Sequence, residues 1–333
     1  MLDVTIVLFR PKSEEFRNAV DSLLLNADSV RAVHILVSGT KSEYSGVKLL
    51  VSSLKGSIEC FVYHRFDNLG FASGHNFLID SAFRSGASFV LVMNPDVILQ
   101  PGAIELLTKS ARSYTRPVLL GPTLRRASEQ GELTEFFDSA GISWTRSGRH
   151  FDSLQGRDWE INEGEEEAVS GVTGACLLVS GTAYEEVKRG SGYFFDDLFL
   201  AYREDAELGI RARQLGVPSA VVHMDGFGHV RSVRGYKRGN RLADLLGVRN
   251  RFLVRWSLGR FRPGIPLVAG ARDCVVAFAA LLGERSSVPG LRSAFAIRRY
   301  ARNRGKHWRT QRGSHGQNQQ SAVLSDGKHA LRR

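Results

Sequence analysis

The sequence predicts an α/β fold in which a mainly parallel sheet is flanked by helices. Runs of β-branched and other apolar residues recur along the first 121 residues, at 4–9, 32–39, 58–64, 88–94 and 117–121. Segments with apolar residues at helical spacing lie between these runs, among them those around 75–85 and 102–112. Strands and helices that alternate in this way form parallel sheets.

The first strand and the helix after it show the pattern most clearly. The run VTIVLF at 4–9 is typical of a strand buried on both of its faces. Glu14 and Glu15 follow, where acids favour the start of a helix, and apolar residues then recur at helical spacing over 16–24. Ligands of such sheets bind outside the carboxyl ends of the strands, so candidate site residues are sought there.

The composition is that of a globular protein. The chain has 333 residues, of which 43% are hydrophobic and 24% charged, and this excludes disorder throughout. The N-terminus has no basic leader, and the apolar run CVVAFAALLG from Cys274 is about half the length that a bilayer crossing needs. Three cysteines without CxxC spacing argue against a zinc site or a disulfide framework. We therefore expect a cytoplasmic protein.

Most of the net charge of +11 lies in the C-terminal segment. Residues 298–333 contain ten Lys and Arg against Asp326 alone, which is +9. Their polar composition favours a solvated, disordered tail, and the alternative is an arm attracted to anionic lipid or nucleic acid. Before it, the segment AGARDCVVAFAALLG is expected to form a helix with one apolar side. That side packs on the rest of the protein or, alternatively, lies at a membrane surface together with the basic segment.

Two motifs follow expected strands. Asp96, in the sequence Asn94-Pro95-Asp96, stands at the carboxyl end of the run 88–94 and could hold a hard cation; an ordinary strand-to-turn sequence is the alternative. The segment NLGFASGHN at 68–76 places glycines between a strand and a helix, where backbone can approach a ligand closely. It matches neither a P-loop nor GxGxxG.

The stretch FFDDLFLAYREDAELGIRARQLGVP at 194–218 combines acids, aromatics and a helical pattern. The helix is expected to begin at Glu204, with an ion pair between Glu207 and Arg211. Asp205 would sit above the buried face of this helix, with Glu204 rotated about 100° from it. An acid at a helix start is usually a favourable end charge. A carboxylate in a pocket walled by Phe195, Phe199 and Tyr202 would instead be a plausible general base.

Taken in order, these motifs resemble glycosyltransferase family 2, and within it the rhamnosyltransferase-like branch that builds bacterial cell-surface polysaccharides. The segments that carry the resemblance are NLGFASGHN, NPDV, SGVTGACLLVSGTAYEEV, FDDLFLAYREDAEL and a histidine after the next strand, and they fall within residues 3 to 255. The resemblance implies a GT-A fold, a nucleotide-sugar donor (a dTDP- or UDP-sugar), a divalent metal (Mn²⁺ or Mg²⁺), inversion at the anomeric carbon, and a glycan or lipid-linked glycan acceptor.

The resemblance also implies roles for individual residues. Asp96 matches the last acid of the family's metal-binding DxD-type motif, with Asn94 in the place of the first, and His229 matches the metal-ligating histidine. Asp205 matches the catalytic base, and Glu204 is expected to position the acceptor or to orient the loop. A histidine ligand makes Mn²⁺ more plausible than Mg²⁺.

Other positions of the family pattern receive lesser roles. Asn68, Gly70 and Asn76, together with Asn94, are the candidates for contact with the donor. Asp196 is expected in a structural or acceptor-loop role. Asp197 is expected to be a solvated neighbour, and His223 is expected to be structural. The small residues of SGVTGA either let substrate approach the backbone or, alternatively, allow tight packing of the sheet.

One departure concerns the nucleotide. Family members usually have an Asp-Asn pair at the end of the second strand, where this chain has Ser38 and Gly39. A catalytically degenerate nucleotide-sugar-binding protein is therefore one alternative. A nucleic-acid-binding protein acting through its basic tail is another, although no nucleic acid is expected, because the rest of the chain is nearly neutral. The expected organisation is a GT-A domain at 1–255, a helical extension at 256–297 and the basic tail at 298–333.

Overall fold

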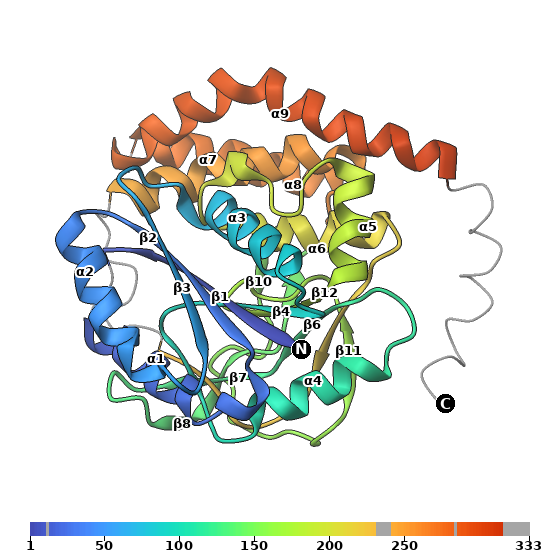
Figure 1. Ribbon diagram of the computed structural model, residues 1–333. Helices are drawn as coiled ribbons and strands as arrows, with labels where there is room; N and C mark the ends of the chain where they lie inside the picture. The colour runs from blue at the N-terminus through green and yellow to red at the C-terminus, as the bar shows by residue number, and fades with distance from the viewer. Residues whose placement is uncertain (11–12, 231–240, 283–284, 316–333) are drawn as a thin grey trace.

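A large mixed sheet forms the centre of the protein. The computed structural model describes residues 1–10, 13–230, 241–282 and 285–315 (Figure 1). The strands of the sheet lie in the order β11-β13-β6-β12-β4-β1-β2-β3. Their bounds are β1 Leu2–Phe9, β2 Ala32–Ser38, β3 Glu59–Arg65, β4 Phe89–Met93, β6 Leu119–Pro122, β11 Glu166–Val169, β12 Cys176–Ser180 and β13 Ser219–Val222.

The sheet is mainly parallel, as the sequence predicts. All five predicted strands are present, as β1, β2, β3, β4 and β6. Only β12 and β11 run against the others, because β12 is inserted antiparallel between β4 and β6 and β11 adds antiparallel to β13 at one edge. The chain passes from β1 to β2 and β3 on one side and returns to β4 on the other. This reversal at β1 and β4 is where α/β sheets open a crevice for ligands.

Helices cover both faces of the sheet. Apolar side chains of α1, α2 and α4 pack on one face, and those of α3, α5 and α6 pack on the other. The helices are α1 Ser13–Leu24, α2 Lys41–Leu50, α3 Gly70–Arg84, α4 Ala103–Ser113, α5 Gly181–Ser191, α6 Glu204–Gln214, α7 Arg241–Leu258, α8 Pro266–Leu282 and α9 Val288–His315, with 3-10 turns η1 Ala27–Ser29, η2 Val51–Leu54, η3 Asp197–Phe199, η4 Gly259–Phe261 and η5 Arg285–Ser287.

The last three helices form an outer layer over α3, α5 and α6 (Figure 1). α9 packs on α7 at backbone distance: a Cβ at Gly290 would lie 2.3 Å from the carbonyl oxygen of Leu245, and one at Gly305 would lie 2.2 Å from that of Ser257. These two glycines therefore allow the close approach. Trp308, near the end of α9, is fully buried.

This outer layer corrects two expectations. Residues 298–315 were expected to be disordered, but they belong to α9, because α9 presents small and aromatic residues to α7 at helical spacing. The rest of the expected tail, 316–333, lies outside the described residues. The expected boundaries at 255/256 and 297/298 fall inside α7 and α9, so neither separates two folded units. In the described part of the chain, no helix is both long and apolar enough to span a bilayer.

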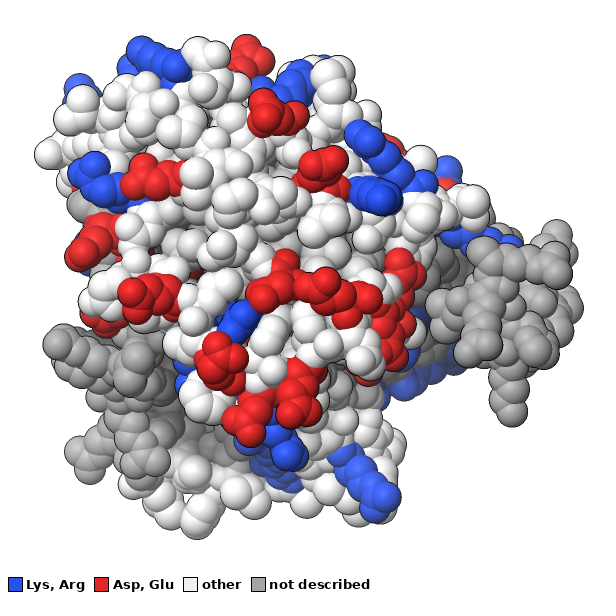
Figure 2. Space-filling model, turned by 90° about the horizontal axis from the view of Figure 1, so that it is seen from below, with Lys and Arg blue, Asp and Glu red and all other residues white. Residues whose placement is uncertain are grey.

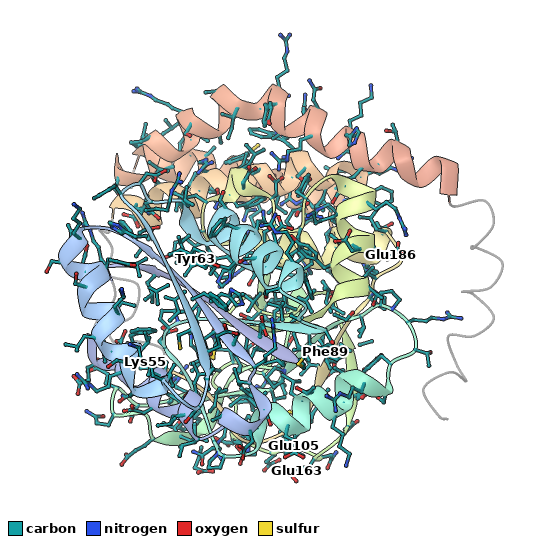
Figure 3. All side chains as sticks on the ribbon, viewed as in Figure 1. Lys55, Tyr63, Phe89, Glu105, Glu163 and Glu186 are labelled. Carbon is teal, nitrogen blue, oxygen red and sulfur yellow. The ribbon has the colours of Figure 1, made fainter. Side chains whose placement is uncertain are left out.

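Charge is separated between two ends of the molecule. The segment 288–315, which forms α9, has eight Lys and Arg and no acid. The opposite end carries gathered acidic side chains (Figure 2), and Glu105 and Glu163 are labelled there in Figure 3. Glu163 belongs to the segment 160–167, which contains five glutamates. The protein is therefore strongly dipolar, with α9 at the basic end.

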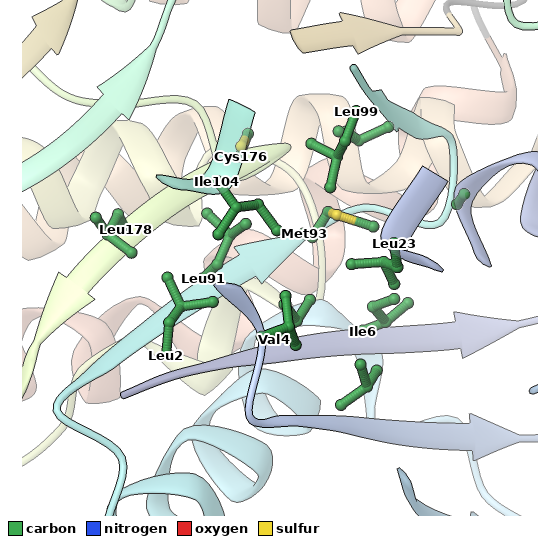
Figure 4. Close-up of a cluster of buried hydrophobic side chains, with 14 of the residues drawn as sticks. Leu2, Val4, Ile6, Leu23, Leu91, Met93, Leu99, Ile104, Cys176 and Leu178 are labelled. Atoms are coloured by element: carbon green, nitrogen blue, oxygen red, sulfur yellow. The ribbon is translucent and has the colours of Figure 1, made fainter. Parts of the chain in front are cut away.

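Alternate residues of β1 supply the two sides of the core. Leu2, Val4 and Ile6 point into the cluster shown in Figure 4, beside residues of α1 and α4. The intervening residues face α3, where Thr5 Oγ1 lies 3.1 Å from Nδ1 of the fully buried His75. Burial lowers the pKa of His75 to about 3, so this histidine is a neutral core residue.

A second, smaller sheet stands at the carboxyl end of β4. Its order is β5-β14-β7-β8, with β5 Val97–Leu99, β7 Leu124–Ala127, β8 Leu133–Ser139 and β14 Phe227–His229. A hairpin of β9 Ile142–Trp144 and β10 His150–Asp152 follows it in the chain. Because β14 pairs with β5, residues near 229 are brought beside residues near 97, just after β4.

Candidate active site

Asp96 and His229 lie together, as the sequence predicts. His229 pairs with Val97 across β14 and β5, and the Val230 N–H donates to the Asp96 carbonyl oxygen at 2.9 Å. The Nε2 atom of His229 is 3.3 Å from Oδ1 of Asp96. The other ring nitrogen, Nδ1, is 2.7 Å from Oδ2 of Asp138, a buried residue at the end of β8 that no sequence motif singles out.

The two carboxylates determine the charge and orientation of the imidazole. Burial alone would lower the pKa of His229, but the hydrogen bonds to Asp138 and Asp96 raise it to about 10. Asp138 fixes the ring so that Nε2 points to Asp96. A carboxylate that holds the far nitrogen of a metal-ligating histidine is a recurrent arrangement in metalloproteins.

The donor set suits a divalent cation. Oδ1 of Asp96 is buried, and the Nε2 atom of the His229 imidazole lies beside it at 3.3 Å. Carboxylate oxygen and imidazole nitrogen are both ligands of Mn²⁺. The described residues hold no cluster of three or more acid, histidine or cysteine side chains suited to a metal, so Asp96 and His229 supply two protein ligands at most from this part of the chain.

Glu204 and Asp205 form the second acidic pair, at the start of α6. Glu204 is 5% exposed, and its Oε2 atom has no hydrogen-bond partner among the residues that the structure describes. Asp205 accepts hydrogen bonds from the N–H of Gly174 at 3.0 Å and from that of Ala206 at 2.7 Å. No lysine or arginine of the described chain forms an ion pair with either acid.

Both acids are harder to ionise than usual. Burial raises the pKa of Glu204 well above its ordinary value, and the neighbouring Asp205 charge raises it further. Burial also raises the pKa of Asp205, although the Gly174 and Ala206 N–H groups oppose this. A carboxylate kept basic in this way is suited to accept a proton near neutral pH.

The loop before this pair is strained. Among described residues other than glycine, five have positive φ, and three of these are Leu200, Tyr202 and Arg203. Such backbone costs of order 1–3 kcal/mol per residue and concentrates at functional sites. The side-chain amide of Asn250, on α7, donates to the carbonyl oxygens of Phe199, Ala201 and Tyr202 at 2.7–2.9 Å. The outer helical layer therefore holds the loop in its strained form.

The predicted ion pair on α6 is present but is buried. Glu207 and Arg211 are both fully inaccessible, with Arg211 Nη2 2.9 Å from Glu207 Oε2. Arg211 also donates to the Phe194 and Tyr193 carbonyl oxygens, and Glu207 accepts from Ser257 on α7 at 3.1 Å. This pair ties α6 to the segment 193–194 and to α7, so its role is structural.

The expected aromatic wall around Asp205 is wrong. Phe195 packs on Phe71 in the core beneath α3, and Phe199 packs among residues of α7 and α9. Tyr202 points into solvent. The three aromatic side chains point in different directions because the 3-10 turn η3 and the positive-φ residues after it redirect the chain between them. Small residues approach Asp205 instead: a Cβ on Gly174 would lie 3.6 Å from its Cβ and 2.9 Å from the Phe71 ring.

The structure gives Asn68, Gly70 and Asn76 structural roles. Oδ1 of Asn68 accepts from the Gly70 N–H at 2.9 Å, and Gly70 has a φ of 72° and no room for a Cβ beside Leu200. Both amide atoms of Asn76 are engaged with the backbone of Phe195, at 2.8 and 2.9 Å. Asn76 therefore holds the backbone of the 194–203 segment, and its expected contact with the sugar donor stays a prediction.

Asn94 connects the two acidic sites. Its backbone N–H donates to the Ala175 carbonyl oxygen at 2.9 Å, across the pairing of β4 with β12. Ala175 is adjacent to Gly174, which donates to Asp205. Asp96, which follows β4, and Asp205, which α6 brings to Gly174 just before β12, are therefore connected through the backbone pairing of Asn94 with Ala175. No side-chain contact of Asn94 is seen among the described residues, so its expected contact with the donor stays a prediction.

The end of β2 shows what replaces the usual Asp-Asn pair. Ser38 is buried, and a Cβ at Gly39 would lie 2.3 Å from Oε2 of Glu43. That carboxylate accepts from the Thr40 N–H at 2.7 Å, so the N-terminal cap of α2 fills the space of a side chain at 39. At the end of β3 nearby, Phe66 is 73% exposed and packs edge-on against His64.

The remaining expectations have structural outcomes. Asp196 is fully buried, caps η3 by accepting from the Leu198 N–H at 3.1 Å, and lies 3.3 Å from Arg304 of α9. Asp197 is half exposed but lies 2.7 Å from the same arginine, so it is not simply solvated. His223, at the far end of β13, is 3.5 Å from Glu167 and is structural, as expected.

Comparison with known proteins supports a glycosyltransferase relationship. No family model matches the chain. The N-acetylglucosaminyl-diphospho-decaprenol L-rhamnosyltransferases of two Mycobacterium tuberculosis strains, CDC 1551 / Oshkosh and H37Rv, are each 33% identical over 152 residues, which is 40% of this chain and 46% of the relative. The chain thus spans about half the length of the curated relatives it matches. These similarities confirm the resemblance to rhamnosyltransferases of family 2 that the motifs indicate.

A solved structure shows the same fold. The structure of GalNAc-T7 with UDP, GalNAc and Mn²⁺ superposes with a TM-score of 0.55 at 11% identity, covering 85% of this chain and 58% of that one. The chain has the GT-A fold, as predicted.

Proposed function

We propose that this protein is an inverting glycosyltransferase that moves a sugar from a nucleotide-diphosphate sugar to a hydroxyl group of a glycan or lipid-linked glycan, in cell-surface polysaccharide synthesis. One observation carries the proposal. A carboxylate–imidazole pair suited to a cation, Asp96 and His229, follows β4, and the half-buried carboxylate of Asp205 on α6 accepts a hydrogen bond from Gly174, just before the β12 strand that pairs with β4.

Asp96 and His229 are the residues that would hold a divalent metal, Mn²⁺ or Mg²⁺. When bound, such an ion neutralises the diphosphate leaving group of the donor. Asp138 keeps the imidazole oriented, and Val230 and Val97 fix the backbone on either side of the pair. At the end of β2 and β3, Glu43 and exposed Phe66 are the groups available to a nucleotide of a UDP- or dTDP-sugar.

Asp205 is the proposed base. It would take the proton from the acceptor hydroxyl as the oxygen attacks the anomeric carbon from the face opposite the leaving diphosphate. The proton passes to Asp205, the new glycosidic bond forms, and the bond to the diphosphate breaks in the same displacement, which inverts the configuration. Glu204, with its raised pKa, would be protonated beside the ionised base and so spare it a second negative charge.

The relatives' printed name supports the finer assignment of a rhamnosyl donor and a lipid-linked acceptor. We extend both to this chain, together with a cytoplasmic location and peripheral contact with an anionic membrane. Residues 1–255 would then supply the catalytic surface, and the helices after them would hold the 198–203 loop.

A catalytically degenerate binder is the second candidate. It is favoured because Ser38 and Gly39 stand where family members have the Asp-Asn pair. The Glu43 side chain, which caps α2, occupies the space that a side chain at position 39 would need. A nucleic-acid-binding function has no comparable support, because Arg304 of α9 pairs with Asp196 and Asp197 and the chain outside the basic C-terminal segment is nearly neutral.

Donor hydrolysis distinguishes these candidates. The purified chain is incubated with UDP-, dTDP- and GDP-sugars with and without Mn²⁺, and the released nucleoside diphosphate is measured. We expect slow, metal-dependent release from one donor, lost in Asp96→Ala, strongly reduced in Asp205→Asn and unchanged in Asp21→Asn, an exposed aspartate of α1. Binding of a donor without any release in the wild type would favour the degenerate binder. Absence of both binding and release would contradict the proposal.

A further inference from the structure

Arginines converge beside Glu204 and Asp205 from several elements. Arg203 precedes the acidic pair, and its Nη1 lies 3.3 Å from Nδ1 of His150 on β10. Arg272 of α8 donates to Ser147 Oγ at 3.2 Å, in the turn of the β9–β10 hairpin. Backbone contacts fix the same junction, because the Ile265 N–H donates to the Arg146 carbonyl oxygen at 2.7 Å.

One acid serves this arginine cluster, which comprises Arg149, Arg203, Arg251, Arg255, Arg262 and Arg272. That acid is Asp273, which binds Arg251 at 2.8 Å, Arg255 at 2.6 Å and Arg262 at 2.9 Å. No described acid forms an ion pair with Arg149, Arg203 or Arg272. The cluster therefore has a large excess of positive charge.

The excess charge is partly desolvated. The Arg251 side chain is 5% exposed, and its Nη2 atom has no hydrogen-bond partner. Burial and the charges of Arg251, Arg272 and Arg149 together lower the pKa of Arg203 to about 10, against the opposing effect of the Asp205 charge. The same surroundings lower the pKa of His150 to about 3, so the imidazole adds no charge. Buried cations without counter-ions are costly, and an anionic ligand would offset that cost.

α8, which supplies Arg272 and Asp273, has its polar side inward and its apolar side outward. These two are the only charged residues of the helix, and Asp273 is buried against α7. Leu267, Val275 and Phe278 are 85%, 66% and 65% exposed, and they follow one another at helical spacing on the outer side. Arg272 and Asp273 thus lie on the inner side of a helix whose outer side is apolar and exposed.

The adjoining α9 is basic, and the opposite end of the molecule is acidic (Figure 2). A molecule with this polarity turns α8 and α9 toward an anionic surface. A ligand with a diphosphate group at the border of an apolar phase matches both features.

We infer that the arginine cluster, and Arg149, Arg203, Arg251 and Arg272 in particular, binds the diphosphate of a lipid-linked acceptor, with the lipid directed along the apolar face of α8. This inference rests on the proposed function and names the acceptor's chemical class. Guanidinium groups form paired hydrogen bonds with phosphate oxygens, and Arg203 would place the sugar attached to the diphosphate directly before Asp205.

The test compares two soluble acceptors with one donor at saturating Mn²⁺. One is N-acetylglucosamine linked through diphosphate to a short alkyl chain, and the other is the uncharged alkyl glycoside of the same sugar. We expect the wild type to prefer the diphosphate acceptor. Arg272→Gln and Arg149→Gln should each lower kcat/KM for that acceptor by about tenfold, while kcat/KM for the glycoside and KM for the donor stay unchanged. Arg213→Gln, an exposed arginine of α6, is the matched control.

A binding measurement without turnover accompanies it. Pyrophosphate alone, without metal, is titrated into each protein by calorimetry, and the two variants should bind it several-fold more weakly than the wild type and Arg213→Gln.

Four results would overturn the inference while the proposed function stands. They are no preference between the acceptors in an active enzyme, an unchanged kcat/KM for the diphosphate acceptor in both variants, a raised KM for the donor in the variants, or weaker binding of the variants to phosphatidylglycerol vesicles with unchanged binding of pyrophosphate. If no acceptor is glycosylated by an otherwise folded protein, the proposed function fails. The pyrophosphate titration then still decides whether the cluster binds a diphosphate.

Discussion

Two pairs of side chains on α6 differ in their partners: the ion pair of Glu207 with Arg211, and the adjacent acids Glu204 and Asp205. Glu207, paired with Arg211, is surrounded by partners: a guanidinium on the same helix and Ser257 on α7. Glu204 and Asp205, one turn earlier, form no ion pair with a described lysine or arginine, and Asp205 accepts hydrogen bonds from two backbone N–H groups. The chain satisfies one pair fully and leaves the other with capacity to react.

The difference shows which property marks a site. Glu204 and Glu207 are both buried, so burial alone does not separate a reactive acid from a structural one. The two glutamates differ in that Glu207 has a cationic partner and Glu204 has none among the described residues. A buried carboxylate without a cationic partner is costly, so it persists only where the surrounding structure holds it in place. Here the strained loop at 200–203, held by Asn250, is what enforces it.

The largest effect is expected at the open pair. Asp205→Asn should reduce the transfer rate by about 10²–10⁴-fold, because the general base is lost while the shape and the Gly174 hydrogen bond are kept. Glu204→Gln should cost far less, because the raised pKa of Glu204 favours its protonated form, which a neutral amide resembles. Single-turnover measurement with both variants makes this comparison, and equal losses would contradict a distinct role for Asp205.

The satisfied pair should matter for folding. Glu207→Gln leaves Arg211 buried without its counter-ion, and we expect a loss of about 3–5 kcal/mol in the free energy of unfolding. Glu186→Gln is the matched control, because it breaks an exposed pair with Arg189 on α5 and should cost about 0–1 kcal/mol. Urea unfolding measures both, and similar small losses would mean that the buried network is not structural.

A smaller effect is expected at the metal pair. Asp138→Asn should weaken Mn²⁺ binding by about 10–100-fold, since the imidazole of His229 loses the carboxylate that orients it. Calorimetric titration of Mn²⁺ in the presence of a nucleoside diphosphate reports this, with Asp21→Asn as the control. Unchanged affinity would show that Asp138 serves only the small sheet.

The smallest effect is a dependence of stability on pH. The pKa of Glu204 is raised in the folded state, so the folded protein binds the extra proton more tightly than the unfolded chain. Protonated Glu204 makes its full contribution to the free energy of unfolding below pH 4.5, its ordinary pKa. That contribution is lost as the pH rises through the pKa of Glu204 in the folded state. The advantage of Glu204→Gln in unfolding free energy over the wild type should therefore grow as pH rises above 4.5. A constant difference across pH would contradict the raised pKa.

The sequence predicts the fold well because its signals are local. Strand runs such as 4–9 and 32–39 have the composition that a buried parallel strand needs, and each forms a strand within a residue or two of its predicted bounds. Asp96, Glu204, Asp205 and His229 could be selected from family motifs, and the structure brings Asp96 and His229 together. The apposition of Asp205 follows from pairing of β4 with β12.

What the sequence does not predict depends on contacts between distant segments. Asp138 is brought to His229 by the pairing of β8 with β7. Asn250 is brought to its loop, 48–51 residues earlier in the chain, by the packing of α7. The basic segment 298–315 is misread as disordered because its helix is stabilised by Trp308 and two close-packed glycines against α7, not by its own composition. The direction of Phe195, Phe199 and Tyr202 likewise depends on a turn with positive φ, which composition does not reveal.

The central claim is that Asp205 reacts and Glu207 supports the fold, and one crossed measurement tests it most directly. The rate of donor cleavage per folded molecule and the urea midpoint are measured for Asp205→Asn and Glu207→Gln under the same conditions. We expect Asp205→Asn to keep or raise the midpoint and to lose the reaction, and Glu207→Gln to lower the midpoint and keep the reaction in its folded fraction. The reverse pattern, with Asp205→Asn unstable but active, would contradict the account.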